Sequence, residues 1–183
     1  MYRILSIAIL SLLGTVLSAQ NAVIKKYEVL PGNYFKHYGT SLDLDLKLDE
    51  DQKIIGRKGL LTDGSLDYAP KTGICYVFWR AKPEDSFISF NLELEKETEI
   101  GNVEIYGSNL SPIYKVVKAA VETSEDEISF DKAGEVAADD KINAQRPWKL
   151  TIPCNKKAKF LKITVWGGEN NYLNVTEIKL TGK

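Results

Sequence analysis

Short runs in which apolar and polar residues alternate recur along the chain from residue 74 to its end. In residues 86–94, SFISFNLEL, one face carries Ile88, Phe90 and Leu92, and the other face is mainly polar. A period of two residues indicates a strand with one buried face. The same pattern predicts strands over 74–81, 100–109, 148–154, 159–167 and 172–182. Gly, Pro, Asn and Asp separate these runs, which favours an antiparallel all-β sandwich or jelly roll.

Other segments are less regular. Residues 40–56 alternate leucine with charge and predict a half-buried strand, and residues 20–39 predict an N-terminal strand and a loop. Residues 114–123 fit either a strand or an amphipathic helix. The acidic stretch 124–140 does not hold a period of 3.6 residues, so we expect a loop with a single turn of helix there.

The first 19 residues predict a cleaved secretory signal peptide. Arg3 precedes an apolar run, and small residues precede a predicted cut after Ala19, with Ser18 as the alternative position. An uncleaved anchor is the other interpretation, although the run is short for a membrane span. No later stretch approaches the roughly 20 apolar residues of a spanning helix, so membrane insertion is not expected. We therefore expect a secreted, periplasmic or cell-surface protein.

The amino-acid composition narrows the range of expected binding partners. The 183 residues include 24 Lys and Arg and 25 Asp and Glu, and loss of Arg3 with the leader gives a net charge near −2. This balance gives no reason to expect nucleic acid as a partner. Cys75 and Cys154 both lie in the predicted exported part, where a disulfide between them can form. The alternative is two separate buried thiols.

Enzymatic motifs are not found. The chain has one histidine, His37, and neither a G-x-S-x-G nor an H-E-x-x-H motif. A glycosidase needs a deep cleft with two positioned carboxyl groups, which a small sandwich rarely has. We therefore expect a protein without catalytic activity.

An ordered set of motifs runs from residue 57 to residue 182. The turn Leu61-Thr62-Asp63-Gly64 precedes a strand that contains Trp79. The segments VEIYG, FLKITV and EIKLTG follow at 103–107, 160–165 and 177–182. This order resembles the galactose-binding-like β-sandwich family, which includes the coagulation factor 5/8 type C (discoidin-like) domains and the family 32 carbohydrate-binding modules. The chain departs from the pattern at NLELEKE, where the family has Asp-Leu-Gly, and in a longer acidic insert at 124–147.

The resemblance implies one domain after the leader. Residues 20–56 would form its N-terminal strand and loop region, and residues 57–183 its discoidin-like sandwich. It also implies a structural Ca²⁺ site in which Asp63 and Glu177 supply carboxylates, and Ser65 or Asp67 and backbone carbonyls add oxygens. Alternatively, Asp63 caps an Asx turn and Glu177 is an ordinary strand residue.

A sugar site needs an aromatic face and planar hydrogen-bonding groups. The resemblance points to Tyr172, just before the closing motif, as the aromatic platform. The candidates for hydrogen bonding are Arg80 and Glu84, at and just past the end of the predicted strand 74–81, and Asn170, Asn171 and His37, in predicted loops.

Ordinary structural roles compete with these assignments. Trp79 and Trp166 lie in predicted strands and fit the core, and Trp148 fits either the core or the rim. An Asn-Asn pair after Gly-Gly is also common turn chemistry.

The sequence thus predicts a secreted, non-catalytic carbohydrate-binding domain with a shallow site built from loops, whose partner is a glycan or glycoprotein. The alternative is a protein-binding adhesion domain, or a structural cell-envelope domain without a small-molecule ligand. Loops with Asn, Glu, Lys and Tyr, rather than pairs of large apolar residues, disfavour a lipid ligand.

Overall fold

The computed structural model describes residues 22–31, 36–37, 47–48, 54–56, 61, 74–77, 86–107, 115–168 and 172–183. The predicted leader, residues 1–19, lies outside them. The strands are β1 (Ile24–Pro31), β2 (Lys36–His37), β3 (Lys47–Leu48), β4 (Ile54–Gly56), β5 (Ile74–Val77), β6 (Phe87–Gly107), β7 (Val116–Ser124), β8 (Asp131–Ala137), β9 (Trp148–Gly167) and β10 (Tyr172–Gly182), and the helix is α1 (Asp140–Asn143). Among the described residues, no helix is long and apolar enough to cross a membrane.

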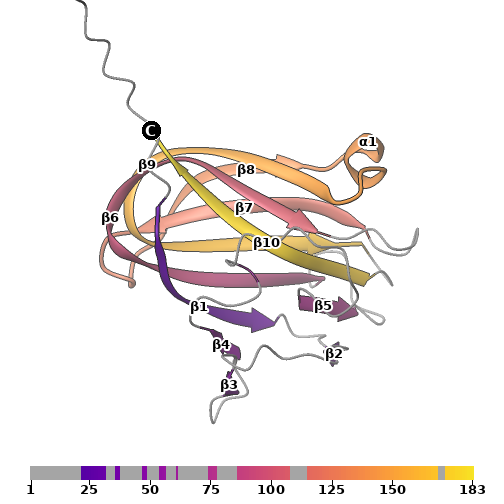
Figure 1. Ribbon diagram of the computed structural model, residues 1–183, viewed down its shortest axis with the longest axis horizontal. Coiled ribbons are helices and arrows are strands. Elements are labelled where there is room, and N and C mark those ends of the chain that lie inside the picture. Colours follow the sequence, from indigo (N-terminus) through magenta and orange to yellow (C-terminus); the bar gives the residue numbers. More distant parts are fainter. Residues whose placement is uncertain are drawn as a thin grey trace, which may run out of the picture.

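Two long strands, β6 and β9, organise the molecule. They pair with each other antiparallel over nearly their whole length, and both bend midway (Figure 1). Their halves at 87–94 and 160–166 lie in one layer, flanked by β1, β4 and β3 on one side and by β7 and β8 on the other. Their halves at 99–107 and 148–157 lie in a second layer with β10, β5 and β2. The predicted antiparallel β-sandwich is confirmed.

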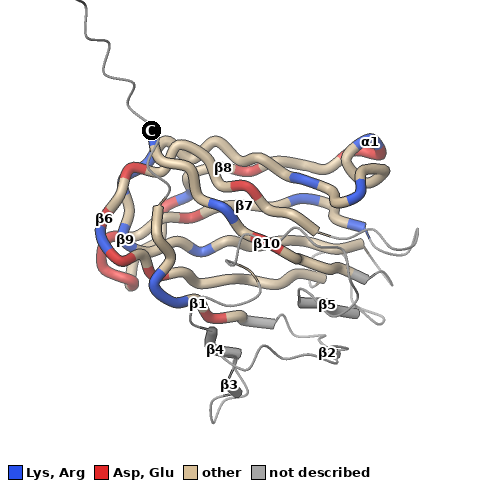
Figure 2. Tube along the Cα trace, in the orientation of Figure 1, with Lys and Arg blue, Asp and Glu red and all other residues tan. Residues whose placement is uncertain are grey.

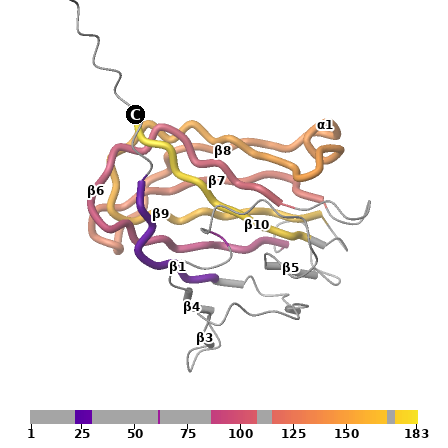
Figure 3. The backbone as a smooth tube through the Cα atoms, viewed as in Figure 1, coloured from indigo at the N-terminus to yellow at the C-terminus, as the bar shows by residue number. Residues whose placement is uncertain are grey.

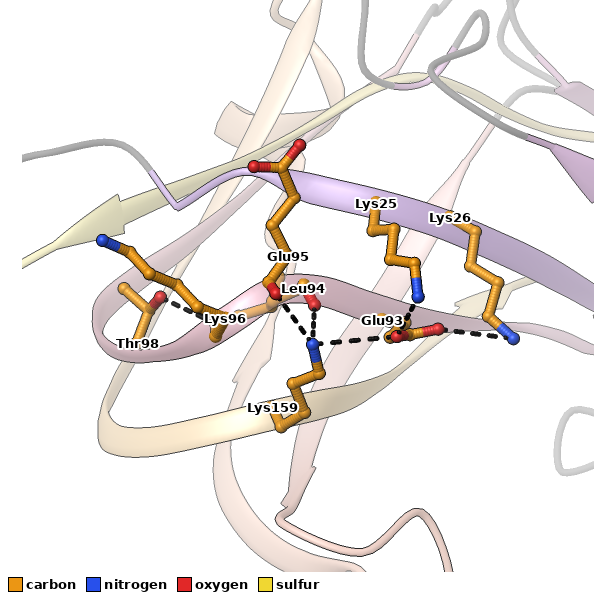
Figure 4. Close-up of polar contacts among 8 residues, drawn as sticks. All are labelled: Lys25, Lys26, Glu93, Leu94, Glu95, Lys96, Thr98 and Lys159. Carbon is orange, nitrogen blue, oxygen red and sulfur yellow. Dashed lines mark hydrogen bonds and ion pairs between the residues drawn. The ribbon is translucent and has the colours of Figure 1, made fainter.

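The bend is a polar corner where β6 and β9 turn together at one end of the molecule (Figure 3). The pairing register shifts there, and the ammonium of Lys159 lies 2.5 Å from the carbonyl oxygen of Leu94 and 2.9 Å from that of Glu95 (Figure 4). It also lies 3.7 Å from Glu93, which pairs with two lysines of β1. Lys159 therefore satisfies carbonyls at the point where the strand ladder is interrupted.

The core lies between the two layers and follows the predicted alternation. Inward side chains of β6, β9, β7 and β10 are almost fully buried, among them Phe90, Val103, Val121, Leu150, Ile163 and Val175. Trp148 is also completely buried, so it belongs to the core and not to the rim. This shared apolar layer is what makes the sandwich one cooperative unit.

Some predicted boundaries were wrong. The separate strands at 86–94 and 100–109 are one strand, β6, and those at 148–154 and 159–167 are one strand, β9. The segment that fitted either a strand or a helix contains the strand β7, Val116–Ser124. The predicted loop at 124–140 contains β8, which the sequence hides because most of its side chains are exposed.

Gly134 allows β8 to pack closely against β9. A Cβ atom at this position would lie 2.4 Å from the carbonyl oxygen of Pro153 and 2.8 Å from Ile152. The edge of the first layer therefore approaches β9 of the second layer more closely than a side chain would allow.

Candidate functional site

The predicted ligand residues gather, as far as the structure describes them, at the end of the sandwich opposite the corner. Tyr172 begins β10 and pairs in register with Val77, the last residue of β5. His37 pairs with Tyr76 from the other side of β5. The strand order β2-β5-β10 therefore places Tyr172 and His37 on two strands that flank β5.

The other candidates, Arg80, Glu84, Asn170 and Asn171, lie outside the described residues. The strands that flank them meet at this same end. Phe87 at the start of β6 pairs with Trp166, and the backbone amide of Gly167 donates to the carbonyl of Ser86 at 2.8 Å.

Trp166 is the aromatic residue that sequence reasoning misplaced. It is half-buried on the outer face of the first layer and not in the core. Its ring centroid lies 6.0 Å from that of Phe87, and the ammonium of Lys118 lies 4.5 Å from its centroid. The signal was present in the sequence, because Ile163 and Val165 face the core and a period of two residues turns position 166 outward.

Glu177 occupies a buried polar position on β10. The pairing of β10 with β6 shifts between Val175 and Glu177, as at a β-bulge. Val175 and Ile178 belong to the core, so the side chains of Thr176 and Glu177 between them both face away from it. Glu177 is only 2% exposed. The backbone amide of the next residue, Ile178, donates to the carbonyl of Leu61 at 2.7 Å. Leu61 precedes Asp63 by two positions, so the predicted turn starts beside Glu177.

Two more oxygens lie on the same stretch of β10. The amide oxygen of Asn174 and the hydroxyl of Thr176 are buried, and within the described part of the chain neither has a hydrogen-bond partner. Unsatisfied buried oxygens are costly unless a ligand or ion contacts them. Oxygen atoms from a carboxylate, an amide and a hydroxyl are the donor set that Ca²⁺ prefers, so these residues fit such an ion.

The remaining predicted ligands, Asp63, Ser65 and Asp67, lie outside the described residues. Within the described ranges, no group of three or more His, Cys, Asp or Glu side chains is placed to hold a metal ion. A site here would therefore need the Asp63 turn to complete it.

A charged cluster lies on the outer face of the second layer, next to Glu177. Tyr106 pairs in register with Glu177 and donates its hydroxyl to Glu104 at 2.7 Å. Lys149 reaches Glu104 at 2.5 Å, and the ammonium groups of Lys149 and Lys179 each lie 5.4 Å from the centre of the Tyr106 ring. Burial alone would raise the pKa of Glu104, but the hydrogen bonds from Lys149 and Tyr106 outweigh it and hold that pKa below its usual range.

We expect Glu104→Gln to weaken the loss of stability on acidification. Because the folded pKa of Glu104 is lowered, its carboxylate stabilises the fold above the unfolded pKa of about 4.3, and this contribution is lost as the pH falls through the folded pKa. Urea unfolding of the wild type and the variant between about pH 6 and pH 3 measures the difference. Glu95→Gln, at an exposed position of the corner, is the matched control. Equal pH slopes for the wild type and Glu104→Gln would contradict the prediction.

The structure does not contain the predicted disulfide, because Cys154 is a free, buried thiol. Cys75 pairs with Asn174 beside Gly107 of β6, whereas Cys154 lies beside Asn102. The two positions on β6 are about 16 Å apart along the strand, and a disulfide needs Cα atoms within about 7 Å. Burial raises the pKa of the Cys154 thiol, which keeps it protonated and unreactive at neutral pH.

The comparisons with known proteins bear on the fold. No protein-family model matches the chain, and no curated protein matches it. Among solved structures, CBM32-3 from a family 31 glycoside hydrolase of Clostridium perfringens is 15% identical with a TM-score of 0.51, over 85% of this chain and 95% of that one. CpGH89CBM32-5 from Clostridium perfringens, in complex with GalNAc-β-1,3-galactose, is 21% identical with a TM-score of 0.51, over 83% and 98%.

A third similar structure holds two domains. The CBM32-1 and CBM32-2 domains of Clostridium perfringens ZmpB, in complex with GalNAc, give 14% identity and a TM-score of 0.56, over 90% of this chain and 36% of that one. The chain thus has the antiparallel β-sandwich fold of family 32 carbohydrate-binding modules across most of its length. The resemblance predicted from the sequence motifs is confirmed at the level of the fold.

Proposed function

We propose that the protein is a non-catalytic carbohydrate-binding domain. The observation that carries this proposal is the fold that it shares over most of its length with carbohydrate-binding modules, two of which have solved complexes with sugars. Fold alone does not fix function. The groups that bind the sugar have to come from the residues at the end of the sandwich opposite the corner, which we call the loop end.

Tyr172 supplies the aromatic platform in this proposal, with Arg80, Glu84, Asn170, Asn171 and His37 as hydrogen-bonding partners. The register supports it, because Tyr172 pairs with Val77, and Arg80 follows Val77 by only three positions. Three steps along a chain span at most about 10 Å, so the proposed pairing of Tyr172 with Arg80 at one site is within the reach of the chain.

The proposal includes export and a structural cation. The leader, residues 1–19, would direct the chain out of the cytoplasm, and residues 20–56 and 57–183 would fold as one domain. Asp63, Ser65 or Asp67, and Glu177 would hold Ca²⁺, with Asn174 and Thr176 as further oxygen donors. When bound, the ion would supply positive charge that neutralises the buried Glu177 carboxylate and joins the Asp63 turn to β10.

A glycan array followed by calorimetric titration tests the sugar site. We expect binding with a modest dissociation constant, since an exposed polar ligand buries little apolar surface. Tyr172→Ala should weaken it about tenfold, because an aromatic contact contributes on the order of 1 kcal/mol.

Phe130→Ala is the matched control, since it removes a half-buried aromatic side chain next to the β7–β8 turn, at the corner end. Equal weakening by both variants would place the sugar elsewhere. An array without any binding, together with a protein that co-purifies, would favour an adhesion role instead.

A further inference from the structure

A small pocket lies on the outer face of the first layer, between the sheet and the β7–β8 turn, residues 125–130. Tyr27, Leu92 and Leu161 belong to the core, so the residues on either side of them face outward. The outward residues that line the pocket are Lys26 and Glu28 of β1, Asn91 and Glu93 of β6, and Phe160 of β9. The turn adds Glu127 and Phe130. Figure 2 shows basic and acidic positions following each other along β1 in this region.

Asn91 is the feature that points to a ligand. Its amide oxygen is buried, and no hydrogen-bond donor reaches it from the part of the chain that the structure describes. Asn91 pairs in register with Lys162 of β9, but the Lys162 ammonium lies 3.4 Å from Glu122 and does not bond to the amide. A buried amide oxygen normally accepts a hydrogen bond. A ligand in the pocket would supply the missing donor.

The size and walls of the pocket restrict the ligand. The enclosed space is about 10 Å³, which holds one group of the size of a water molecule. Two half-buried aromatic residues, Phe130 and Phe160, line it. The face of a phenyl ring attracts cations, and its apolar surface packs against methylene groups. The pocket therefore suits a small polar head on a slender apolar chain.

The charges select the head group. Glu93 is already compensated, because two lysines of β1 lie 2.7 Å and 3.5 Å from its carboxylate and Lys159 lies 3.7 Å away (Figure 4). Glu28 and Glu127 also line the pocket, and neither forms an ion pair within the described ranges. Two such carboxylates and the Asn91 oxygen are all acceptors, which favours a cationic donor.

A metal ion is a poorer fit than an organic cation. Among the described residues, no group of three or more His, Cys, Asp or Glu side chains is placed to hold one. Aromatic rings also replace the further oxygen atoms that a hard cation needs.

The turn that closes the pocket is held in shape by its own hydrogen bonds. The Ser124 hydroxyl oxygen accepts from the backbone amides of Asp126 at 3.2 Å and Glu127 at 3.0 Å. The Asp126 carboxylate accepts from the amides of Ile128 at 2.9 Å and Ser129 at 3.0 Å. Glu127 has a φ of 66°, a left-handed conformation that costs energy for a residue other than glycine. The hydrogen bonds on either side therefore fix the backbone of Glu127 before any ligand binds.

We propose that this pocket binds a primary ammonium group at the end of an unbranched aliphatic chain, independently of the loop site. The ammonium donates to the Asn91 amide oxygen and to the carboxylates of Glu28 and Glu127. The methylene groups of the chain contact Phe130 and Phe160. Lysine side chains of a partner protein and free diamines share this chemistry.

Nuclear magnetic resonance titration of the full chain with butylamine tests the proposal, at neutral pH where the amine is protonated. Amide signals of residues 26–28, 91–93, 127–130 and 160–161 should shift, with a dissociation constant on the order of 1 mM. Butanol has the same shape without the charge, and tetramethylammonium has the charge but is too large for the enclosed space. Both should leave these signals unchanged at about ten times that concentration.

Two variants sharpen the test. Asn91→Leu removes the buried acceptor and should weaken butylamine binding about tenfold, the scale of one hydrogen bond to a charged group. Glu127→Gln should weaken it about threefold, the scale of an exposed ion pair. Glu125→Gln is the matched control, because it makes the same change in the same turn at an exposed residue that does not line this pocket. It should bind as the wild type does.

The source of the ammonium group is distinguished with two further probes, the peptide acetyl-Gly-Lys-Gly-amide and the free diamine cadaverine. Ile128, 84% exposed on the turn, offers apolar surface to a peptide beside the pocket. Tighter binding of the peptide, lost in Ile128→Ala, would identify a lysine side chain of a partner protein. Tighter binding of cadaverine would identify a free amine.

Three results would overturn the proposal. These are equal shifts with butanol, equal weakening by Glu125→Gln and Glu127→Gln, or wild-type affinity in Asn91→Leu with an otherwise native spectrum. None of them would affect the proposed sugar site at the loops, whose ligand carries no ammonium group in that proposal.

Discussion

Replacing Gly107 with alanine is expected to destabilise the protein by about 3 kcal/mol, at the upper end of what overpacking costs. A Cβ atom there would lie 2.0 Å from Cζ2 of Trp148 and 2.1 Å from the carbonyl oxygen of Asn174. Neither neighbour can shift easily. Trp148 is fully buried, and Trp148 and Asn174 belong to β9 and β10, the two strands that flank Gly107 on β6. Neither can move without disturbing the ladder on one side of β6.

Gly101→Ala, in the same strand, is the matched control. Its Cβ would lie 3.1 Å from the carbonyl oxygen of Gly182, a contact that a small shift near the chain end can relieve. Urea unfolding followed by tryptophan fluorescence measures both variants. A loss below about 1 kcal/mol in Gly107→Ala would show that Trp148 can repack, contrary to this expectation.

Removal of divalent cations is expected to lower the melting temperature by roughly 5 to 10 °C. A ligand present at about one hundred times its dissociation constant stabilises the folded state by about 2.7 kcal/mol, and each kcal/mol corresponds to about 2 to 4 °C for a domain of this size. The buried oxygens of Asn174 and Thr176 beside the Glu177 carboxylate are the physical basis.

Differential scanning calorimetry with Ca²⁺ and with a chelator measures this shift. Glu177→Gln should abolish the response to Ca²⁺, because an amide contributes no charge to the site. Glu104→Gln, one strand away on β6, should keep the full response. If the chelator leaves the wild-type melting temperature unchanged, Glu177 is a structural carboxylate and the cation proposal is wrong.

The alternating pattern predicted the architecture well because most strands have one face in the core. β10 runs from Tyr172 to Gly182, the range expected from the sequence. The sequence did not predict the corner. Exposed polar residues such as 95–97 resemble a loop, although the pairing of β6 with β9 resumes just beyond them. The sequence did not predict β8 either, because Gly134 and its mostly exposed neighbours show no regular alternation of apolar and polar residues.

The sites were less predictable than the fold. Sequence motifs led to Glu177 and Tyr172 because both belong to one closing segment. The pocket beside Asn91 could not be anticipated, since its walls come from β1, β6, β9 and the β7–β8 turn. Only the folded chain brings Glu127 to the same pocket as Glu28.

The continuous passage of β6 and β9 through both layers has a mechanical consequence. The polypeptide crosses from one layer to the other twice, through β6 and β9, and these two strands are paired with each other on both sides of the corner. We expect amide hydrogens on both halves of these strands to exchange together, in a single global opening. A load applied to the loop end would therefore be carried through the whole domain to its corner.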